Sequence, residues 1–286
     1  MSARFLAIVL WLPLVAAAQA HYAKGKLLAT LKNPDIDESS GIACGRANKG
    51  IFWTHNDSGD RPRIYAFGRN GEDIAAFKLA GAINHDWEDI ASFTLDGKPY
   101  LLIGDVGDNS YSRDDCSLYL VREPVLDGAR RKFRGKLRVE MPIDFRYEDG
   151  PRNCEAVAFD PTSRLILLAT KGLATGCRIY SLPLPRKPSR DVFVAKLIAT
   201  VKVPMVTAMD ISPDGRRAIL LTYGDAFEFA RRPGEPWKRA FARPPRRITM
   251  PPRRQGEAIC YGPDGVTLYL TSEKTPTPLF EVPVEK

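Results

Sequence analysis

Acidic side chains recur at the beginning of a short pattern that repeats along the chain. The pattern has a β-branched residue third and a small residue fourth, and it occurs at 40–43, 88–91, 155–158, 209–212 and 257–260. Carboxylates near these segments, or just after the apolar run that follows each, are the candidate metal ligands: Glu38, Glu88, Asp105, Glu155, Asp210, Glu257 and Glu273. Carboxylates gathered in one place repel one another unless protons or cations offset their charge. An all-oxygen site suits Ca²⁺, which takes roughly six to eight oxygen ligands, so calcium is the expected cofactor.

The same carboxylates have an alternative role that needs no metal. Acidic residues at strand starts also organise loops and accept hydrogen bonds from the backbone amides of neighbouring strands. The segment 105–109, Asp-Val-Gly-Asp-Asn, resembles part of a calcium loop but lacks the spacing of an EF-hand. The sequence leaves a bound cation and a purely structural role both open.

Two histidines stand beside acidic residues and are the candidate catalytic groups. His55 lies in 53–60 and His85 in 84–89, and either imidazole could serve as general acid or base because its charge changes near neutral pH. The alternative is a histidine held by a neighbouring aspartate and packed on a tryptophan. Residues adjacent to these histidines or on loops of the same face are the candidate ligand-binding group: Asn56, Asp57, Asp86, Trp87, Lys171 and Tyr223.

The elements that position these residues are predicted strands. A strongly apolar run follows each acidic segment, at 51–54, 100–103, 165–168, 218–221 and 266–270. A third segment with period-2 alternation recurs at 64–67, 118–121, 179–182, 226–229 and 279–282. Weaker fourth strands are expected at 74–79, 136–141, 192–201 and 237–248, and the last unit lacks its own. We expect 26–32, near the N-terminus, to supply the missing strand.

Repeated four-stranded units of about 50 residues are the signature of a β-propeller. The sequence therefore predicts an all-β fold of five four-stranded blades, the last closed by the N-terminal strand, which covers an otherwise free edge. Six blades would need a hidden unit in the long 90–157 interval, where 133–147 is the extra stretch. A two-sheet sandwich is the other alternative.

The strand order explains why distant residues should meet. In an antiparallel hairpin the start of one strand lies beside the end of the next. The starts of the innermost strands and the ends of the second strands therefore share one face of the disc, near its axis. We expect the candidate metal ligands and ligand-binding residues to line the mouth of a central channel on this face.

Composition and the N-terminus narrow the classes of function. The 286 residues carry 42 Lys and Arg against 34 Asp and Glu, a net charge of +8. Arg4, the apolar run 5–18 and the ending Ala18-Gln19-Ala20 predict a signal peptide at 1–20, with 21–286 as one domain. The run is too short for a membrane span, so we expect an exported protein, periplasmic or secreted. Because an exported protein is separated from nucleic acid, we expect none to be bound despite the basic charge.

The five cysteines fit no zinc pattern and include no Cys-x-x-Cys. Export permits disulfides, although an odd number leaves at least one thiol over. Cys154 with Cys177 is a plausible bridge within one repeat, and the sequence leaves the pairing open.

With its repeated Glu-x-(Ile/Val)-Ala segments, tyrosine-bearing third strands and leader, the chain resembles exported bacterial β-propellers of the phytase-like esterase and gluconolactonase-like kinds. The resemblance implies a divalent cation at the channel mouth, on acidic ligands. Carried over by position, the implied ligands are Glu88, Glu155, Asp210 and Glu257. Two units depart from the pattern. Ser40 stands where an acid is expected, with Glu38 two residues earlier, and Met209 holds the matching position in the fourth unit.

Two functions remain open. The first is an exported scaffold that binds a small ligand or an extracytoplasmic protein at its acidic mouth. The second is a divalent-metal-dependent hydrolase of an ester, lactone or phosphoester, in which the ion polarises a substrate oxygen or activates water. The sequence contains no Gly-x-Ser-x-Gly, Ser-x-x-Lys, His-Glu-x-x-His or P-loop motif. The absence of a catalytic motif favours the scaffold.

Overall fold

A computed structural model of the chain describes residues 21–126, 132–172 and 176–285, so the leader predicted at 1–20 lies outside the described part. Within these ranges the fold is all-β except for one short helix, α1 (Trp237–Phe241). None of the described residues forms a helix with the length and apolar character needed to cross a bilayer.

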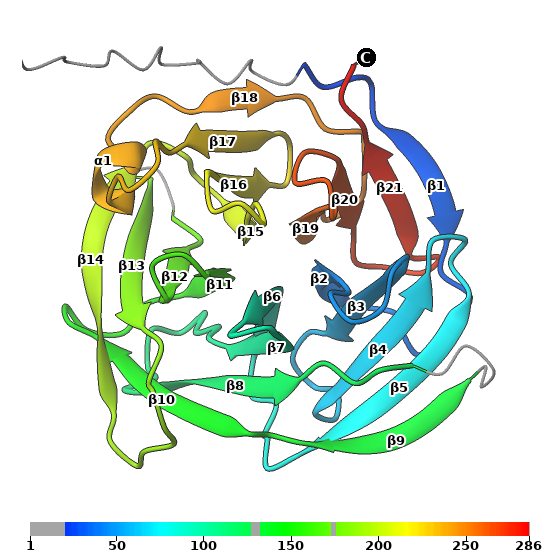
Figure 1. The fold of residues 1–286 in the computed structure, drawn as a ribbon, viewed down its shortest axis with the longest axis horizontal. Helices are drawn as coiled ribbons and strands as arrows, with labels where there is room; N and C mark the ends of the chain where they lie inside the picture. The colour runs from blue at the N-terminus through cyan, green and yellow to red at the C-terminus, as the bar shows by residue number, and fades with distance from the viewer. Residues whose placement is uncertain (1–20, 127–131, 173–175, 286) are drawn as a thin grey trace, which may run out of the picture.

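The strands form antiparallel groups of four, which we call units one to five, arranged propeller-like around a common centre (Figure 1). Unit one contains β2 (Ser39–Cys44), β3 (Ile51–Asn56), β4 (Arg63–Gly68) and β5 (Asp73–Ala80). Unit two contains β6 (Trp87–Leu95), β7 (Lys98–Asp105), β8 (Cys116–Arg122) and β10 (Met141–Tyr147). Unit three contains β11 (Cys154–Asp160), β12 (Leu165–Thr170), β13 (Cys177–Pro183) and β14 (Phe193–Val201). Unit four contains β15 (Val206–Ile211), β16 (Arg217–Thr222), β17 (Ala226–Ala230) and β18 (Arg246–Ile248). Unit five contains β19 (Ala258–Tyr261), β20 (Leu268–Thr271), β21 (Pro278–Val282) and β1 (Lys26–Thr30).

The N-terminal strand closes the last unit, as the sequence predicts. β1 pairs antiparallel with β21, so that Lys26 lies opposite Glu281 and Thr30 opposite Pro278. The Lys26 ammonium also lies 3.0 Å from the Glu281 carboxylate. The first and last segments of the described chain therefore share one sheet (Figure 1).

The stretch 133–147 forms two strands that extend existing sheets. β10 is the fourth strand of unit two and also pairs parallel with β14, which joins units two and three into an eight-stranded sheet. β9 (Phe133–Arg138) pairs parallel with β5, outside unit one. The fourth strand predicted at 136–141 was therefore wrong. The alternating buried side chains Met141, Ile143, Phe145 and Tyr147 are the stronger strand signal.

The strand predicted at 237–248 is also wrong over its first half, which forms α1. Trp237, Ala240 and Phe241 are buried at helical spacing, so one face of a helical turn packs on the core. Pro244 and Pro245 then prevent strand pairing, because proline lacks the N–H that a strand ladder needs. Only 246–248 joins the sheet, as β18.

The innermost strands β2, β6, β11, β15 and β19 lie side by side in a ring around the centre (Figure 1). Asp89 of β6 links three of them, because its Oδ2 accepts the backbone N–H groups of Val157 (3.0 Å) and Met209 (3.1 Å). Asp210 of β15 links a fourth, since its Oδ2 accepts the N–H of Tyr261 at 2.8 Å. Buried carboxylates thus bond the inner strands to one another, in addition to apolar packing.

The described cysteines are all free and buried. The bridge suggested between Cys154 and Cys177 is not present. The two sulfurs face different carbonyl oxygens: Cys154 Sγ lies 3.3 Å from Ala169 O and Cys177 Sγ lies 3.5 Å from Arg178 O.

Candidate metal centre

Carboxylates from four of the five units meet at one end of the central ring. We call these residues the acidic ring: Glu38, Asp57, Asp86, Glu88, Glu155, Glu257 and Glu273. They stand at the starts of inner strands or the ends of second strands, as the hairpin geometry predicts. Asp57 lies close enough to interact electrostatically with Glu38, Asp86, Glu88, Glu155 and Glu273. The charge of each carboxylate in the acidic ring therefore affects the ionisation of the others.

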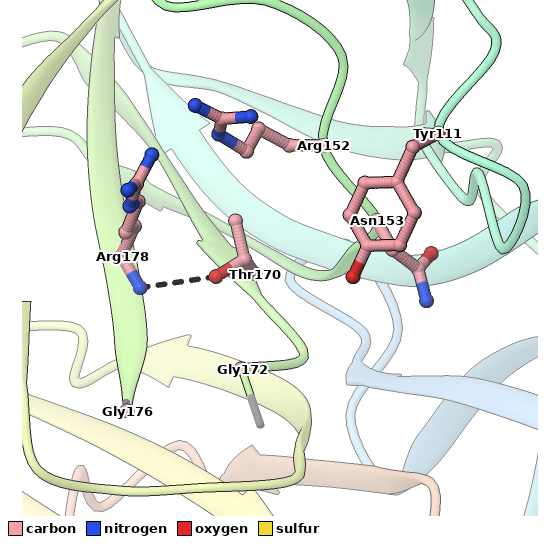
Figure 2. Close-up of a pocket in the computed structure, with 7 residues that line it drawn as sticks. All are labelled: Tyr111, Arg152, Asn153, Thr170, Gly172, Gly176 and Arg178. Atoms are coloured by element: carbon pink, nitrogen blue, oxygen red, sulfur yellow. Dashed lines mark hydrogen bonds between the residues drawn. The ribbon is translucent and has the colours of Figure 1, made fainter. Parts of the chain in front are cut away.

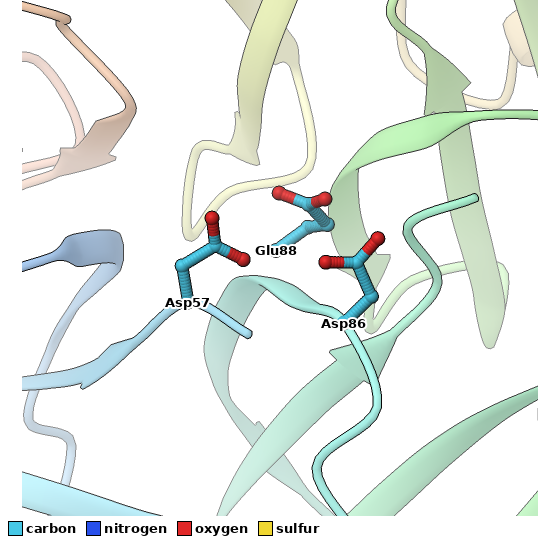
Figure 3. Close-up of side chains that lie close together, drawn as sticks. All are labelled: Asp57, Asp86 and Glu88. Carbon is cyan, nitrogen blue, oxygen red and sulfur yellow. The ribbon is translucent and has the colours of Figure 1, made fainter. Parts of the chain in front are cut away.

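Within the acidic ring, three carboxylates form a tight cluster. Asp57 follows β3, Asp86 precedes β6, and Glu88 is the second residue of β6. One oxygen from each lies within 4.8 Å of the other two, and Figure 3 shows the side chains converging. Two oxygens on opposite sides of a bound Ca²⁺ are about 5 Å apart, because each Ca–O distance is about 2.3–2.6 Å. The spacing of this cluster fits such an ion.

Gly107 has no side chain, and this makes room for the cluster. A Cβ built on Gly107 would collide with Glu88 Oε1 and Asp86 Oδ2. The loop after β7 therefore needs glycine here because two carboxylates approach its backbone, and no left-handed conformation is involved. The N–H groups of Val106 and Gly107 also donate to the carbonyl of Asp86, each at 3.1 Å, which fixes the loop against the cluster.

The protonation of this cluster is strongly perturbed. Burial, with the charges of Asp57 and Glu155, raises the pKa of Asp86 to about 6. Burial and the charge of Glu155 raise the pKa of Glu88 well above its usual range. Without a cation, Glu88 therefore favours its protonated form, and Asp86 gains a proton as the pH falls through about 6. Such shifts concentrate at functional sites.

Lys171 provides positive charge inside the acidic ring. Its ammonium lies 3.1 Å from Glu155 Oε1 and 5.6 Å from the centre of the Tyr223 ring. Burial alone would lower the pKa of Lys171, but Glu155 and Tyr223 raise it, so the lysine stays charged. Burial and the charges of Glu273 and Glu155 raise the pKa of Glu257 to about 8. Glu257 is therefore a protonated acid at neutral pH that sits beside a charged lysine.

Glu38 and Glu273 form the outer part of the acidic ring. Glu38 is exposed and Glu273 is half-buried, and each interacts with Asp57. Glu273 Oε2 accepts a hydrogen bond from Gln255 Nε2 at 2.7 Å. Burial raises the pKa of both carboxyls, reinforced by neighbouring acids.

Two predicted metal ligands, Asp105 and Asp210, instead bond other groups of the protein. Asp105 is fully buried, pairs with Arg113 Nη1 at 2.9 Å and accepts the N–H of Asp86 at 3.1 Å. Asp210 accepts backbone N–H groups with both oxygens, those of Ile211 and Tyr261 at 2.8 Å each. The structure places both residues as hydrogen-bond acceptors that hold loops and strands together.

The two histidines differ in their surroundings. His55 has no exposed surface, its Nδ1 lies 3.0 Å from the carbonyl of Asn56, and its ring packs edge-on against Trp87. Burial lowers the pKa of His55, so its ring is neutral. A substrate at the mouth cannot reach it. His85 is exposed, and its backbone N–H donates to Asp105.

Asn56 and Trp87, both predicted to bind ligand, are buried and bonded within the protein. The Asn56 amide donates to the carbonyl of Asp35 at 2.7 Å and to Asp37 at 3.0 Å. The Trp87 indole N–H donates to the carbonyl of Ile83 at 2.8 Å. These two residues shape the walls of the site. Lys171 and Tyr223 are the half-buried members of the predicted ligand-binding group that lie beside Glu155 and Glu257.

A pocket of about 250 Å³ lies between units two and three, and Figure 2 shows the residues that line it. Its lining residues are Tyr111, Arg152, Asn153, Thr170, Gly172, Gly176 and Arg178. Asn153 connects the pocket to the ring, since its amide donates to Glu155 Oε1 at 2.8 Å. Arg152 and Arg178 share the carboxylate of Asp149, at 2.8 and 2.7 Å, so this side of the pocket carries net positive charge.

Sequence reasoning missed Asn153 and Gln255, although a positional signal marks both. Each stands two residues before the first residue of the repeated pattern, as Asp86 does before Glu88. In the structure Asn153 bonds Glu155, and Gln255 bonds Glu273. Aligning the units two residues further upstream would have identified a polar side chain at this position in each of them: Glu38, Asp86, Asn153, Thr207 and Gln255.

Comparison with known proteins identifies no family. No protein-family profile matches the chain, and no curated protein matches it. Among solved structures, the chain is similar to a gluconolactonase from Xanthomonas campestris, at 10% identity, with 91% of this chain and 89% of that protein covered. The TM-score is 0.49.

Proposed function

We propose that residues 21–286 form a five-bladed β-propeller whose channel mouth binds a divalent cation, Ca²⁺ by preference, on Asp57, Asp86 and Glu88. The main support is the single observation that oxygens of these three side chains lie within 4.8 Å of one another. The raised pKa of Asp86 and Glu88 adds to it, because a cation relieves the repulsion that burial makes costly. Units one to five are the five blades, and 1–20 is the leader of an exported, periplasmic or secreted protein.

We further propose that the protein is a divalent-metal-dependent hydrolase acting on an ester, lactone or phosphoester. The bound cation would polarise a substrate oxygen. Lys171, held by Glu155, offsets negative charge that develops on the substrate. Glu257, whose pKa burial raises to about 8, holds a proton at neutral pH that can pass to a leaving group. These residues take the acid–base role that the sequence predicted for His55 and His85.

The first test is a calorimetric titration of the full chain with Ca²⁺, before and after Glu88→Gln. We expect one cation per chain and a loss of affinity of at least tenfold in the variant. Glu148→Gln is the matched control, since Glu148 lies away from the ring and pairs with exposed Lys196. Equal affinity in wild type and Glu88→Gln would refute the proposed site.

Hydrolysis is tested with p-nitrophenyl acetate, a γ-lactone and p-nitrophenyl phosphate, with and without EDTA. We expect turnover of one class that EDTA abolishes and Ca²⁺ restores. Glu257→Gln should abolish turnover while leaving Ca²⁺ affinity within about threefold, because Glu257 lies outside the three-carboxylate cluster. Turnover that survives both EDTA and Glu257→Gln would refute the hydrolase.

The second candidate function is the scaffold that binds a small ligand or an extracytoplasmic protein. It is favoured by the buried position of His55 and by Tyr111, a residue that lines the pocket and is 53% exposed. Exposed aromatic rings supply contact area at binding surfaces. Cation binding without turnover on any of the three substrate classes would select this function.

A further inference from the structure

One pair of cysteine sulfurs lies within contact distance at the seam between the first and last units. Cys44 Sγ and Cys260 Sγ are 3.6 Å apart, and the two residues are separated by 216 positions in the chain. Cys44 is the last residue of β2 and Cys260 lies in β19, the innermost strands of units one and five. These two strands are neighbours in the central ring (Figure 1).

The surroundings of this pair are apolar and closed. Cys44 and Cys260 are 3% and 2% exposed, and they pack in one cluster with Phe52, Tyr269 and Leu279. The backbone is anchored on the β2 side, because Ser92 Oγ donates to the carbonyl of Cys44 at 2.5 Å. The two sulfurs face each other across a seam that also carries hydrogen bonds, such as Ser39 Oγ with Thr271 Oγ1 at 2.8 Å.

We propose that Cys44 and Cys260 form a disulfide bond that joins β2 and β19, the innermost strands of units one and five. Inside unit five, β1 and β21 already join the first and last strands of the described chain through backbone hydrogen bonds. The disulfide would require the sulfurs to approach from 3.6 Å to about 2.05 Å. The proposal does not depend on the cation site or on hydrolysis.

The reaction needs an oxidant, because two thiols lose two electrons. Both S–H bonds break, one S–S bond forms, and two protons and two electrons pass to a disulfide-class oxidant, which becomes two thiols. The predicted export of the chain would expose it to oxidants of this class. Because both sulfurs are buried in the folded protein, the bond forms before the seam closes and afterwards resists exchange.

The test is a thiol count on the full chain refolded in a glutathione redox buffer and then denatured. The chain has five cysteines, so one disulfide leaves three titratable thiols and lowers the intact mass by about 2 Da. A proteolytic digest without reductant should contain a linked pair of peptides with Cys44 and Cys260. Five titratable thiols, or a link that involves Cys116, Cys154 or Cys177, would overturn the proposal.

Two serine variants control for unrelated oxidation. Cys44→Ser should leave four thiols and no linked peptides, whereas Cys177→Ser should leave two thiols and keep the link. The stabilising effect of the disulfide is tested by thermal unfolding. We expect the Tm to be at least about 5 °C higher in the oxidised than in the reduced wild type, because a cross-link over a long loop restricts the unfolded chain. A linked protein with the same Tm as its reduced form would overturn the stabilising role.

Discussion

The affinity of the acidic mouth for Ca²⁺ should fall steeply between pH 7 and pH 5. Two of the three cluster carboxyls, Asp86 and Glu88, have a pKa raised by burial, to about 6 for Asp86. A cation binds the ionised form of its ligands, so protons compete with it in this range. The sign follows directly: lower pH means more protonated carboxylate and weaker cation binding.

The magnitude can be worked from Asp86 alone. With a pKa of about 6, its carboxyl is about 90% ionised at pH 7 and about 10% ionised at pH 5. The apparent affinity should therefore fall about tenfold between these pH values from this residue. The raised pKa of Glu88 steepens the loss further. Binding at pH 6 should also release protons.

The assay is isothermal titration calorimetry of Ca²⁺ at pH 5, 6 and 7, in two buffers that differ in ionisation enthalpy. The difference between buffers gives the number of protons released. Asp86→Asn is the informative variant, because it binds more weakly overall but loses the titrating group, so its pH dependence should be shallower by up to about tenfold. Equal affinity at pH 5 and pH 7, with no proton release, would refute the assignment of the cluster as a cation site.

The remaining predictions concern the charges and backbone around the site. Lys171→Met should lower the free energy of unfolding at pH 7 by about 3 kcal/mol, since it leaves a buried carboxylate unpaired, whereas exposed Lys196→Met should change it by less than about 1 kcal/mol in the same urea titrations. Asp89→Asn should cost about 3 kcal/mol, because an amide cannot accept all the backbone N–H groups that link the inner strands; unchanged stability would contradict that role. Gly107→Ala should weaken Ca²⁺ binding more than tenfold by displacing two carboxylates, while Gly224→Ala, whose Cβ would make an ordinary contact with Thr222 Oγ1 at 3.8 Å, should leave the titration unchanged. In EDTA, the free energy of unfolding should fall as pH rises from 4.5 to 8, the window in which the folded protein holds more protons than the unfolded chain. A thermal melt at each pH measures this, and a rise over the window would contradict it.

Much of the strand arrangement could be predicted because the five units repeat the same residue types in the same order. Each unit starts with a small, β-branched pattern and continues with an apolar run, and these match the inner and second strands of the structure. The fourth strands were harder to predict because the outer edge is less buried. The fourth strand of unit two follows the alternating apolar residues at 141–147 and not the basic stretch before them. In unit four, the apolar residues from Trp237 to Phe241 have helical spacing, so this half of the predicted strand forms a helix.

For the site, the sequence predicted some of the residues that meet, but not Asn153 or Gln255, and not what each side chain would bond. Hairpin geometry brings Asp57, Asp86 and Glu88 to one place, as expected. Whether a carboxylate faces a cation or a backbone amide depends on the neighbouring unit, which local sequence does not reveal. Asp210 accepts the N–H of Tyr261 from the next unit, and His55 is sealed by packing against Trp87. Contacts across units therefore separate the candidate ligands from the structural acids.

The most direct test of the cation site is a crystal structure of the protein grown with Ca²⁺, with anomalous data collected at long wavelength. We expect an anomalous peak with oxygens of Asp57, Asp86 and Glu88 at about 2.3–2.6 Å. A map with no peak at these carboxylates, at a calcium concentration that saturates the calorimetric signal, would contradict the proposed metal centre.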